Sequence, residues 1–181
     1  LTFTIEAPLT TIFKDRGDER REQEAKVILP GSDGRNVTVG VDVRTRGKSR
    51  AARAICEFPP LRLDFDNAKH GTVFDRQNDL KLVTHCQDKR SEYDQYVLQE
   101  YLVYRMYGLL TEQSFKVRLA RVTYIDTEGK RDAVTRHGFL IEPVEDMAER
   151  NGWQALELPA VPPQLVDPRS VALVALFQYL I

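Results

Sequence analysis

The chain has 181 residues, 42% of them hydrophobic, which is enough to build one sizeable core. Its 26 Lys and Arg residues and 27 Asp and Glu residues give a net charge of −1, which excludes the overall positive field typical of nucleic-acid-binding proteins. No run approaches the roughly 20 apolar residues of a membrane-spanning helix. Partners must therefore be inferred from local sites.

Alternating apolar and polar residues predict a series of β-strands in the first half of the chain. The predicted strands cover residues 1–8, 24–30, 36–46, 55–65 and 80–86. Pro59 and Pro60 restrict the first half of the fourth strand to an edge or an irregular course. The intervening run 14–24 mixes both charges, so we expect it to be a solvated loop.

One long helix and a β-hairpin follow. Ser91 is a candidate N-cap for a helix that we expect to end at Gly108. Residues 114–126 and 133–142 flank a turn and predict an antiparallel hairpin. Together with the earlier strands, this order predicts an α+β fold with an antiparallel sheet packed against a helix.

The last segment, 168–181, predicts a helix with Asp167 as its N-cap and Pro168 in its first turn. Apolar residues occupy every face of this helix, so we expect it to lie in a core. The helix reaches Ile181 without a capping residue, and we therefore expect the chain to be a piece of a longer protein.

Cys56 and Cys86 both lie in strand-like segments, so one disulfide and two free thiols are both compatible with the sequence. A disulfide would favour an oxidising compartment such as the periplasm. Because the sequence starts at Leu1 rather than methionine, a periplasmic or secreted protein that has lost a signal peptide also fits, and the localisation stays open.

Lys81 lies in the predicted strand 80–86, on the face opposite Leu80 and Leu82. Glu100, on the long helix, has apolar and aromatic neighbours at helical spacing. Burying a lone carboxylate is costly, so Glu100 needs a cationic partner or partial exposure. One interpretation is that Glu100 holds Lys81 toward ATP phosphates. The other is that Glu100 binds tyrosine hydroxyls and Lys81 is ordinary strand surface.

The turn TRGKSRAAR concentrates four basic residues, Arg46, Lys48, Arg50 and Arg53. Its backbone N–H groups and guanidinium groups could bind phosphate oxygens, although a solvated basic hairpin tip has the same pattern. The three histidines have no metal-ligand spacing with the cysteines, so the sequence predicts no metal site within the chain.

Six stretches in this order resemble the CotH-type atypical kinases, the spore-coat kinase-like proteins, and especially a bacterial branch of that group. They cover roughly residues 41–150 and read VRTRGKSR, FPPLRLDF, LKLVTHCQD, YVLQEYLVYRMYGLLT, SFKVRLARVTYID and GFLIEPVEDMAER. The resemblance implies a kinase-like N-terminal lobe over residues 1–142. Residues 143–181 would then be the hinge, a connector and the first helices of a truncated C-terminal lobe.

The resemblance also implies a nucleotide site. It places Arg46 and Gly47 along the nucleotide, Glu100 as the acidic partner on the helix and Glu142 at the hinge between lobes. Phe58 and Pro59 stand where that family has a lysine pair, so the corresponding phosphate contact is expected to move to Lys81 or Arg62. ATP and Mg²⁺ are the expected cofactors. The catalytic and metal-binding aspartates are expected beyond Ile181, so this chain alone should be inactive.

The leading functional hypothesis is therefore the nucleotide-binding part of an ATP-dependent phosphotransferase, with a protein as a possible phosphoacceptor. The alternative is a non-catalytic pseudokinase or envelope scaffold that uses the basic turn to bind an anionic partner. Nucleic-acid binding ranks behind both because the turn lacks interleaved aromatic residues.

Overall fold

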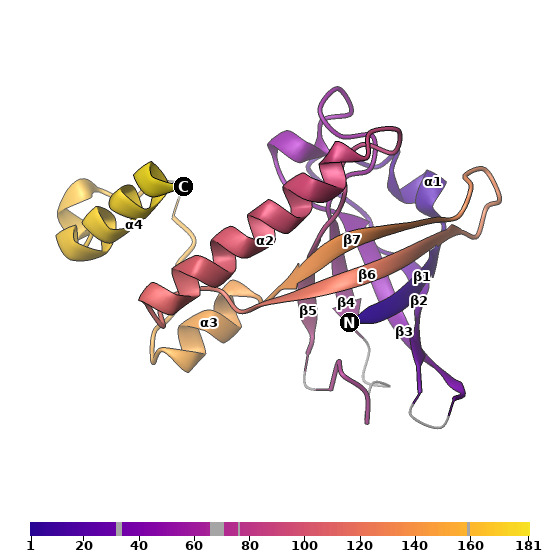
Figure 1. Ribbon diagram of the computed structural model, residues 1–181, viewed down its shortest axis with the longest axis horizontal. Coiled ribbons are helices and arrows are strands. Elements are labelled where there is room, and N and C mark those ends of the chain that lie inside the picture. The colour runs from indigo at the N-terminus through magenta and orange to yellow at the C-terminus, as the bar shows by residue number, and fades with distance from the viewer. Residues whose placement is uncertain (32–33, 66–70, 76, 159) are drawn as a thin grey trace.

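The computed structural model describes residues 1–31, 34–65, 71–75, 77–158 and 160–181. Within these residues, seven strands form a closed barrel, and helix α2 (Glu92–Leu110) lies against its outer surface (Figure 1). The strands are β1 (Thr2–Ala7), β2 (Gln23–Pro30), β3 (Asn36–Thr45), β4 (Leu61–Phe65), β5 (Asp79–Val83), β6 (Val117–Asp126) and β7 (Val134–Ile141).

The strand order around the barrel is β1-β2-β3-β4-β5-β7-β6. All neighbouring strands are antiparallel except β1 and β6, which run parallel and close the barrel from Thr2↔Arg121 to Ala7↔Asp126. The prediction of an α+β kinase-like lobe, with an antiparallel sheet packed against a helix, is wrong. Alternation within a strand identifies its buried face but does not show which distant strands pair. The pair that closes the barrel, β1 and β6, is formed by strands far apart in the chain.

The predicted strands and their inward faces are largely confirmed. Val39, Val41 and Val43 of β3 point into the barrel, as do Leu80 and Leu82 of β5. Aromatic side chains complete the interior, and the following are at most 1% exposed: Phe3, Phe58, Phe74 and Tyr124. Burial of these rings adds to the hydrophobic stabilisation that the aliphatic core residues provide.

The outer surface of β5, β7 and β6 is also apolar, because α2 covers it (Figure 1). Val97 of α2 is buried there, and the rings of Tyr101 and Tyr104 lie 5.9 Å and 5.7 Å from the ring of Phe139. Helix α2 continues two residues past Gly108, where the sequence predicts its end.

Asp88 connects the tip of the β6–β7 hairpin to the chain that follows β5. Its carboxylate contacts Nε2 of the buried His85 at 2.7 Å and accepts a hydrogen bond from Arg131 at 2.7 Å. Arg136 donates to the carbonyl of the same residue at 3.1 Å. The hydrogen bond with His85 lowers the pKa of Asp88 despite partial burial, and Arg131 lowers it further.

The remaining helical elements are short apart from α4. They are α1 (Leu9–Ile12), the 3₁₀ turns η1 (Ser49–Ala51) and η2 (Pro163–Leu165), α3 (Val144–Arg150) and α4 (Pro168–Leu180). Among the helices of the described part, α2 and α4 included, there is none with the length and apolar character needed to cross a membrane.

Helix α4 begins as predicted, because the Asp167 carboxylate accepts a hydrogen bond from the Ser170 N–H at 2.8 Å. Its predicted burial in a core is wrong. Phe177 is its one buried residue, and its ring lies 5.1 Å from that of Tyr107 on α2. The barrel interior is filled by side chains from the strands, from α1 and from the segments that carry Phe58 and Phe74, and α4 lies outside it.

Candidate functional site

A groove of about 210 Å³ lies between the basic turn after β3 and helix α2. Residues 46–50 form one wall, and Glu100 and Tyr104 of α2 form the other. Its floor is apolar and is made by Pro60, Val83 and Ile141. The groove therefore combines a basic wall, a second wall with a carboxylate and a phenol, and an apolar floor.

The basic turn owes its course to Gly47, whose φ of +91° lies in the left-handed region. A side chain is strained in this region, so glycine allows the chain to reverse directly after Arg46. The Arg46 N–H donates to the Pro60 carbonyl at 2.9 Å, which holds the start of the turn against the residue before β4. The 3₁₀ turn η1 then places Arg50 toward α2.

Two arginines from the run 14–24 fasten the basic turn from outside the groove. Arg20 donates to the carbonyls of Thr45 at 3.4 Å and Gly47 at 2.8 Å. Arg16 donates to the carbonyls of Cys56 at 2.5 Å and Glu57 at 2.7 Å. The prediction of a purely solvated loop is therefore wrong for these two residues, because their guanidinium groups bind backbone carbonyls.

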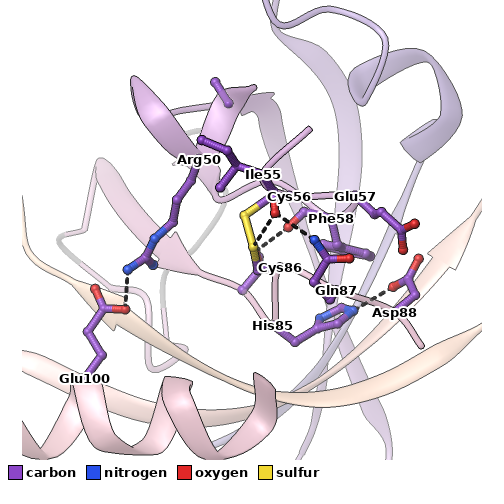
Figure 2. The surroundings of a disulfide bond; sticks show 12 residues. Arg50, Ile55, Cys56, Glu57, Phe58, His85, Cys86, Gln87, Asp88 and Glu100 are labelled. Atoms are coloured by element: carbon purple, nitrogen blue, oxygen red, sulfur yellow. Dashed lines mark hydrogen bonds and ion pairs between the residues drawn. A yellow bond between two sulfur atoms is a disulfide. The ribbon is translucent and has the colours of Figure 1, made fainter. Parts of the chain in front are cut away.

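A disulfide between Cys56 and Cys86 joins the end of the basic segment to the chain after β5. Phe58 and Cys86 form a β-bridge beside it, and Gln87 donates to the Ile55 carbonyl at 2.7 Å (Figure 2). Of the two cysteine states compatible with the sequence, the structure contains the disulfide. Together with Arg20, which binds the carbonyls of Thr45 and Gly47, this bond fixes both ends of the segment that carries Arg50.

Glu100 forms its salt bridge with Arg50, at 2.8 Å, rather than with Lys81 (Figure 2). The Lys81 ammonium lies 5.0 Å from the centre of the Phe115 ring. The predicted Lys81–Glu100 pair is thus absent, because Arg50 in the basic turn reaches Glu100 directly. Through Arg50, Glu100 holds the basic turn against α2.

Three cations stand side by side on the outer surface of the barrel. The register pairs Arg44 of β3 with Arg62 of β4, and Arg62 with Lys81 of β5. Arg44 is neutralised by Glu22 at 3.2 Å, and Arg62 by Asp79 at 2.8 Å. Lys81 has no such carboxylate within 4.0 Å among the described residues.

Arg46 and Lys81 are consequently the half-buried cations without a salt bridge at this site. Burial lowers the pKa of Lys81, and the nearby charge of Arg46 lowers it further, although Asp79 opposes both. Burial also lowers the pKa of Arg46, and Arg50 lowers it further, although Tyr104, Asp79 and Glu100 oppose both. A bound anion would relieve this repulsion and raise both pKa values.

Glu142 lies outside the groove. Its carboxylate accepts a hydrogen bond from the Lys116 N–H at 2.7 Å and also pairs with the Arg150 guanidinium. These contacts fasten the end of β7 to α3. Of the six residues predicted to bind a nucleotide, Arg46, Gly47 and Glu100 line the groove, and Lys81 and Arg62 lie in the adjacent cation row.

Arg50 and Tyr104 also line the groove. Arg50 was predicted to bind phosphate only as one of the four basic residues of the turn, and no site role was predicted for Tyr104. Arg50 belongs to the basic cluster, and Tyr104 lies one helical turn from Glu100, so both signals were present in the sequence. In the described part of the chain, no three His, Cys, Asp or Glu side chains come together as a metal site.

Comparisons of the chain with protein-family models, with curated proteins and with solved structures found no match. The resemblance to CotH-type kinases therefore stays a prediction that rests on the quoted stretches.

Proposed function

We propose that the groove between the basic turn and α2 binds the phosphate chain of a nucleoside triphosphate. The observation that carries this proposal is a pair of half-buried cations without a salt bridge among the described residues. Arg46 lines the groove, and Lys81 lies beside it in the cation row. Holding two like charges close together under partial burial is unfavourable unless an anion joins them. A phosphate chain supplies several negative charges along its length.

The donors suit phosphate oxygens. Arg46 offers a planar guanidinium that can donate two parallel hydrogen bonds, and Lys81 adds a compact point charge. Arg50 also faces the groove, although its bond to Glu100 at 2.8 Å already occupies one of its nitrogens. The phenol of Tyr104 is a further donor on the opposite wall.

The size of the groove limits which part of the ligand it holds. Pockets for drug-sized molecules usually enclose about 300–1,000 Å³, so about 210 Å³ fits a phosphate chain better than a whole nucleotide. The base and ribose would extend out of the groove. No interaction with Glu142 is part of this proposal, because Arg150 and the Lys116 N–H already occupy that carboxylate.

Phosphoryl transfer stays a prediction, because the closed barrel removes the argument from a kinase-like lobe. Mg²⁺ also stays a prediction, since carboxylates hold it together with phosphate oxygens. A non-catalytic scaffold would use the same groove, and an assay for ATP turnover would separate the two alternatives.

The proposal is tested by calorimetric titration with ATP and with inorganic triphosphate. Charged hydrogen bonds contribute about 1.5–3 kcal/mol, so Lys81→Gln or Arg46→Gln should weaken triphosphate binding about 10- to 100-fold. Arg44→Gln is the matched control, because it removes the same charge from the same row of cations but from a residue paired with Glu22. We expect its affinity to stay within about threefold of the original.

Two results would contradict the proposal: no triphosphate binding by folded protein, or equal losses in the Lys81 and Arg44 variants. Comparison of the affinities for ATP and for inorganic triphosphate measures what the nucleoside adds to binding. If triphosphate binds as tightly as ATP, the phosphate site stands and the assignment of a nucleoside fails.

A further inference from the structure

A second basic hollow, of about 670 Å³, lies on the other side of the basic turn. Its rim carries Lys14 from the chain after α1, Lys48 from the turn itself and Arg53 from the segment that follows η1. Lys48 lines both this hollow and the groove beside α2. The turn therefore separates two adjacent basic depressions.

The three rim cations are available for a partner. Lys14, Lys48 and Arg53 are exposed, and none forms a salt bridge within the part of the chain that the structure describes. Asp18 is the one carboxylate among the described lining residues. With a net charge of −1 for the whole chain, such an excess of positive charge is a local feature of this surface.

Arg16 and Arg20 also line the hollow, but their guanidinium groups are occupied. Arg16 donates to the carbonyls of Phe13, Ala51, Cys56 and Glu57, and Arg20 to those of Gly17, Thr45 and Gly47. Burial lowers the pKa of Arg16, and the charge of Arg53 lowers it further. These arginines therefore form a rigid base of positive charge beneath the exposed rim.

We propose that this hollow binds an acidic segment of a partner protein. The carboxylates of that segment would bind Lys14, Lys48 and Arg53. Its volume accommodates several side chains of an extended peptide. Ala52 is exposed beside the buried Ala51, which leaves a small apolar contact for a residue between the carboxylates. Exposed lysine and arginine side chains at a rim mainly increase the association rate and select partners of opposite charge.

A nucleic acid fits this hollow less well. Single-stranded nucleic acids need exposed aromatic rings on which bases stack, and the one aromatic residue of the lining, Phe13, is 2% exposed. Most of the guanidinium N–H groups of Arg16 already bind carbonyls, so Arg16 cannot grip a phosphate with two parallel bonds. The free donors suit carboxylates spaced along a peptide.

The test measures fluorescence anisotropy of a fluorescein-labelled decapeptide that alternates Glu and Ala, at low ionic strength. We expect saturable binding that the double variant Lys14→Glu, Arg53→Glu weakens by about tenfold or more. The double variant Lys26→Glu, Arg121→Glu is the matched control. It makes the same change in net charge at exposed residues of β2 and β6, away from the hollow, and should bind within about threefold of the original.

Equal losses in the two double variants, or no binding by folded protein, would overturn the proposal. Tighter binding of a single-stranded oligonucleotide of equal charge would overturn it as well. The inference is independent of the phosphate groove, since Lys14 and Arg53 do not line the groove. Lys81→Gln should leave peptide binding unchanged, and the Lys14, Arg53 variant should leave triphosphate binding unchanged, so the two proposals fail separately.

Discussion

The barrel and the C-terminal segment 153–181 are both rich in apolar residues, yet they bury them very differently. Val43 and Leu82 inside the barrel are 0% exposed, whereas Leu165 and Tyr179 in the C-terminal segment are 73% and 87% exposed. Apolar content alone therefore does not determine burial. What matters is whether the elements enclose a shared interior.

Geometry explains the difference. In a strand every second side chain points to the same face, so a ring of strands directs half of its residues into one common interior. Helix α4 carries apolar residues on all sides, and its one buried contact, Phe177 against Tyr107, leaves its other faces exposed. The variants below test how far the two regions differ in stability, from the largest expected effect to the smallest.

Removal of the disulfide should have the largest effect on the barrel side of the comparison. Cys56 and Cys86 are 30 residues apart, and closing a loop of that length stabilises a fold by about 4 kcal/mol when the effect is attributed to the unfolded chain. The double variant Cys56→Ala, Cys86→Ala should lower the free energy of unfolding by about that amount in urea titration. Triphosphate binding should weaken as well, because the bond fixes the basic segment.

The control for this prediction is reduction of the original protein, which should lower stability to a similar extent. If reduced and oxidised protein unfolded at the same urea concentration, the disulfide would have no part in holding the barrel together.

Gly138→Ala should be the next most damaging change. A Cβ at Gly138 would lie 2.8 Å from the backbone carbonyl oxygen of Val83, so β5 and β7 would have to separate locally. Overpacking of this kind costs about 1–3 kcal/mol, and we expect about 2 kcal/mol in urea unfolding. Gly17→Ala is the matched control, because no atom lies within 4 Å of its Cβ position, and it should leave stability nearly unchanged. Equal effects at the two glycines would contradict close packing between these strands.

Asp88→Asn should cost about 1–2 kcal/mol at neutral pH, because it weakens the bonds to His85 and Arg131. The folded-state pKa of Asp88 lies below its usual value, so its contribution is present above the unfolded pKa and is lost as pH falls through the folded pKa. The variant should therefore lose less stability than the original protein on acidification below about pH 4. Parallel acid-unfolding curves for the two proteins would show that Asp88 makes no such contribution.

Phe177→Ala should have the smallest effect, although the same change in a core costs about 3–5 kcal/mol. Phe177 contacts α2 from outside the barrel, so we expect barrel unfolding in urea to change by less than about 1 kcal/mol. Phe139→Ala, at a 0% exposed position beneath α2, is the matched comparison and should fall in the core range. A similar loss from both variants would mean that α4 and the barrel form one cooperative unit.

The sequence predicted the strands, the hairpin and the start of α4 because each depends on local patterns. The alternation of β3 and the Asp167 cap are examples, and both are found in the structure. Barrel closure could not be predicted in this way, because the pairing of β1 with β6 depends on backbone groups that have no sequence signature.

The same reasoning applies to the site. The basic turn and Glu100 stand out in the sequence, and both line the groove. The partner of Glu100 was mistaken because the sequence alone does not show which cation reaches α2; in the structure it is Arg50, whereas Lys81 lies over Phe115. The role of Arg16 was hidden because its acceptors are carbonyls, which every residue carries.

The parallel pairing of β1 with β6 also determines when the barrel can close during synthesis. The amino group of Leu1 donates to the carbonyl of Leu119, 118 positions along the chain, so the first strand has no closing neighbour until β6 has left the ribosome. At about 5–20 residues per second, this wait is on the order of ten seconds. During synthesis one edge of β1 stays unpaired, and its free N–H and C=O groups could pair with another chain.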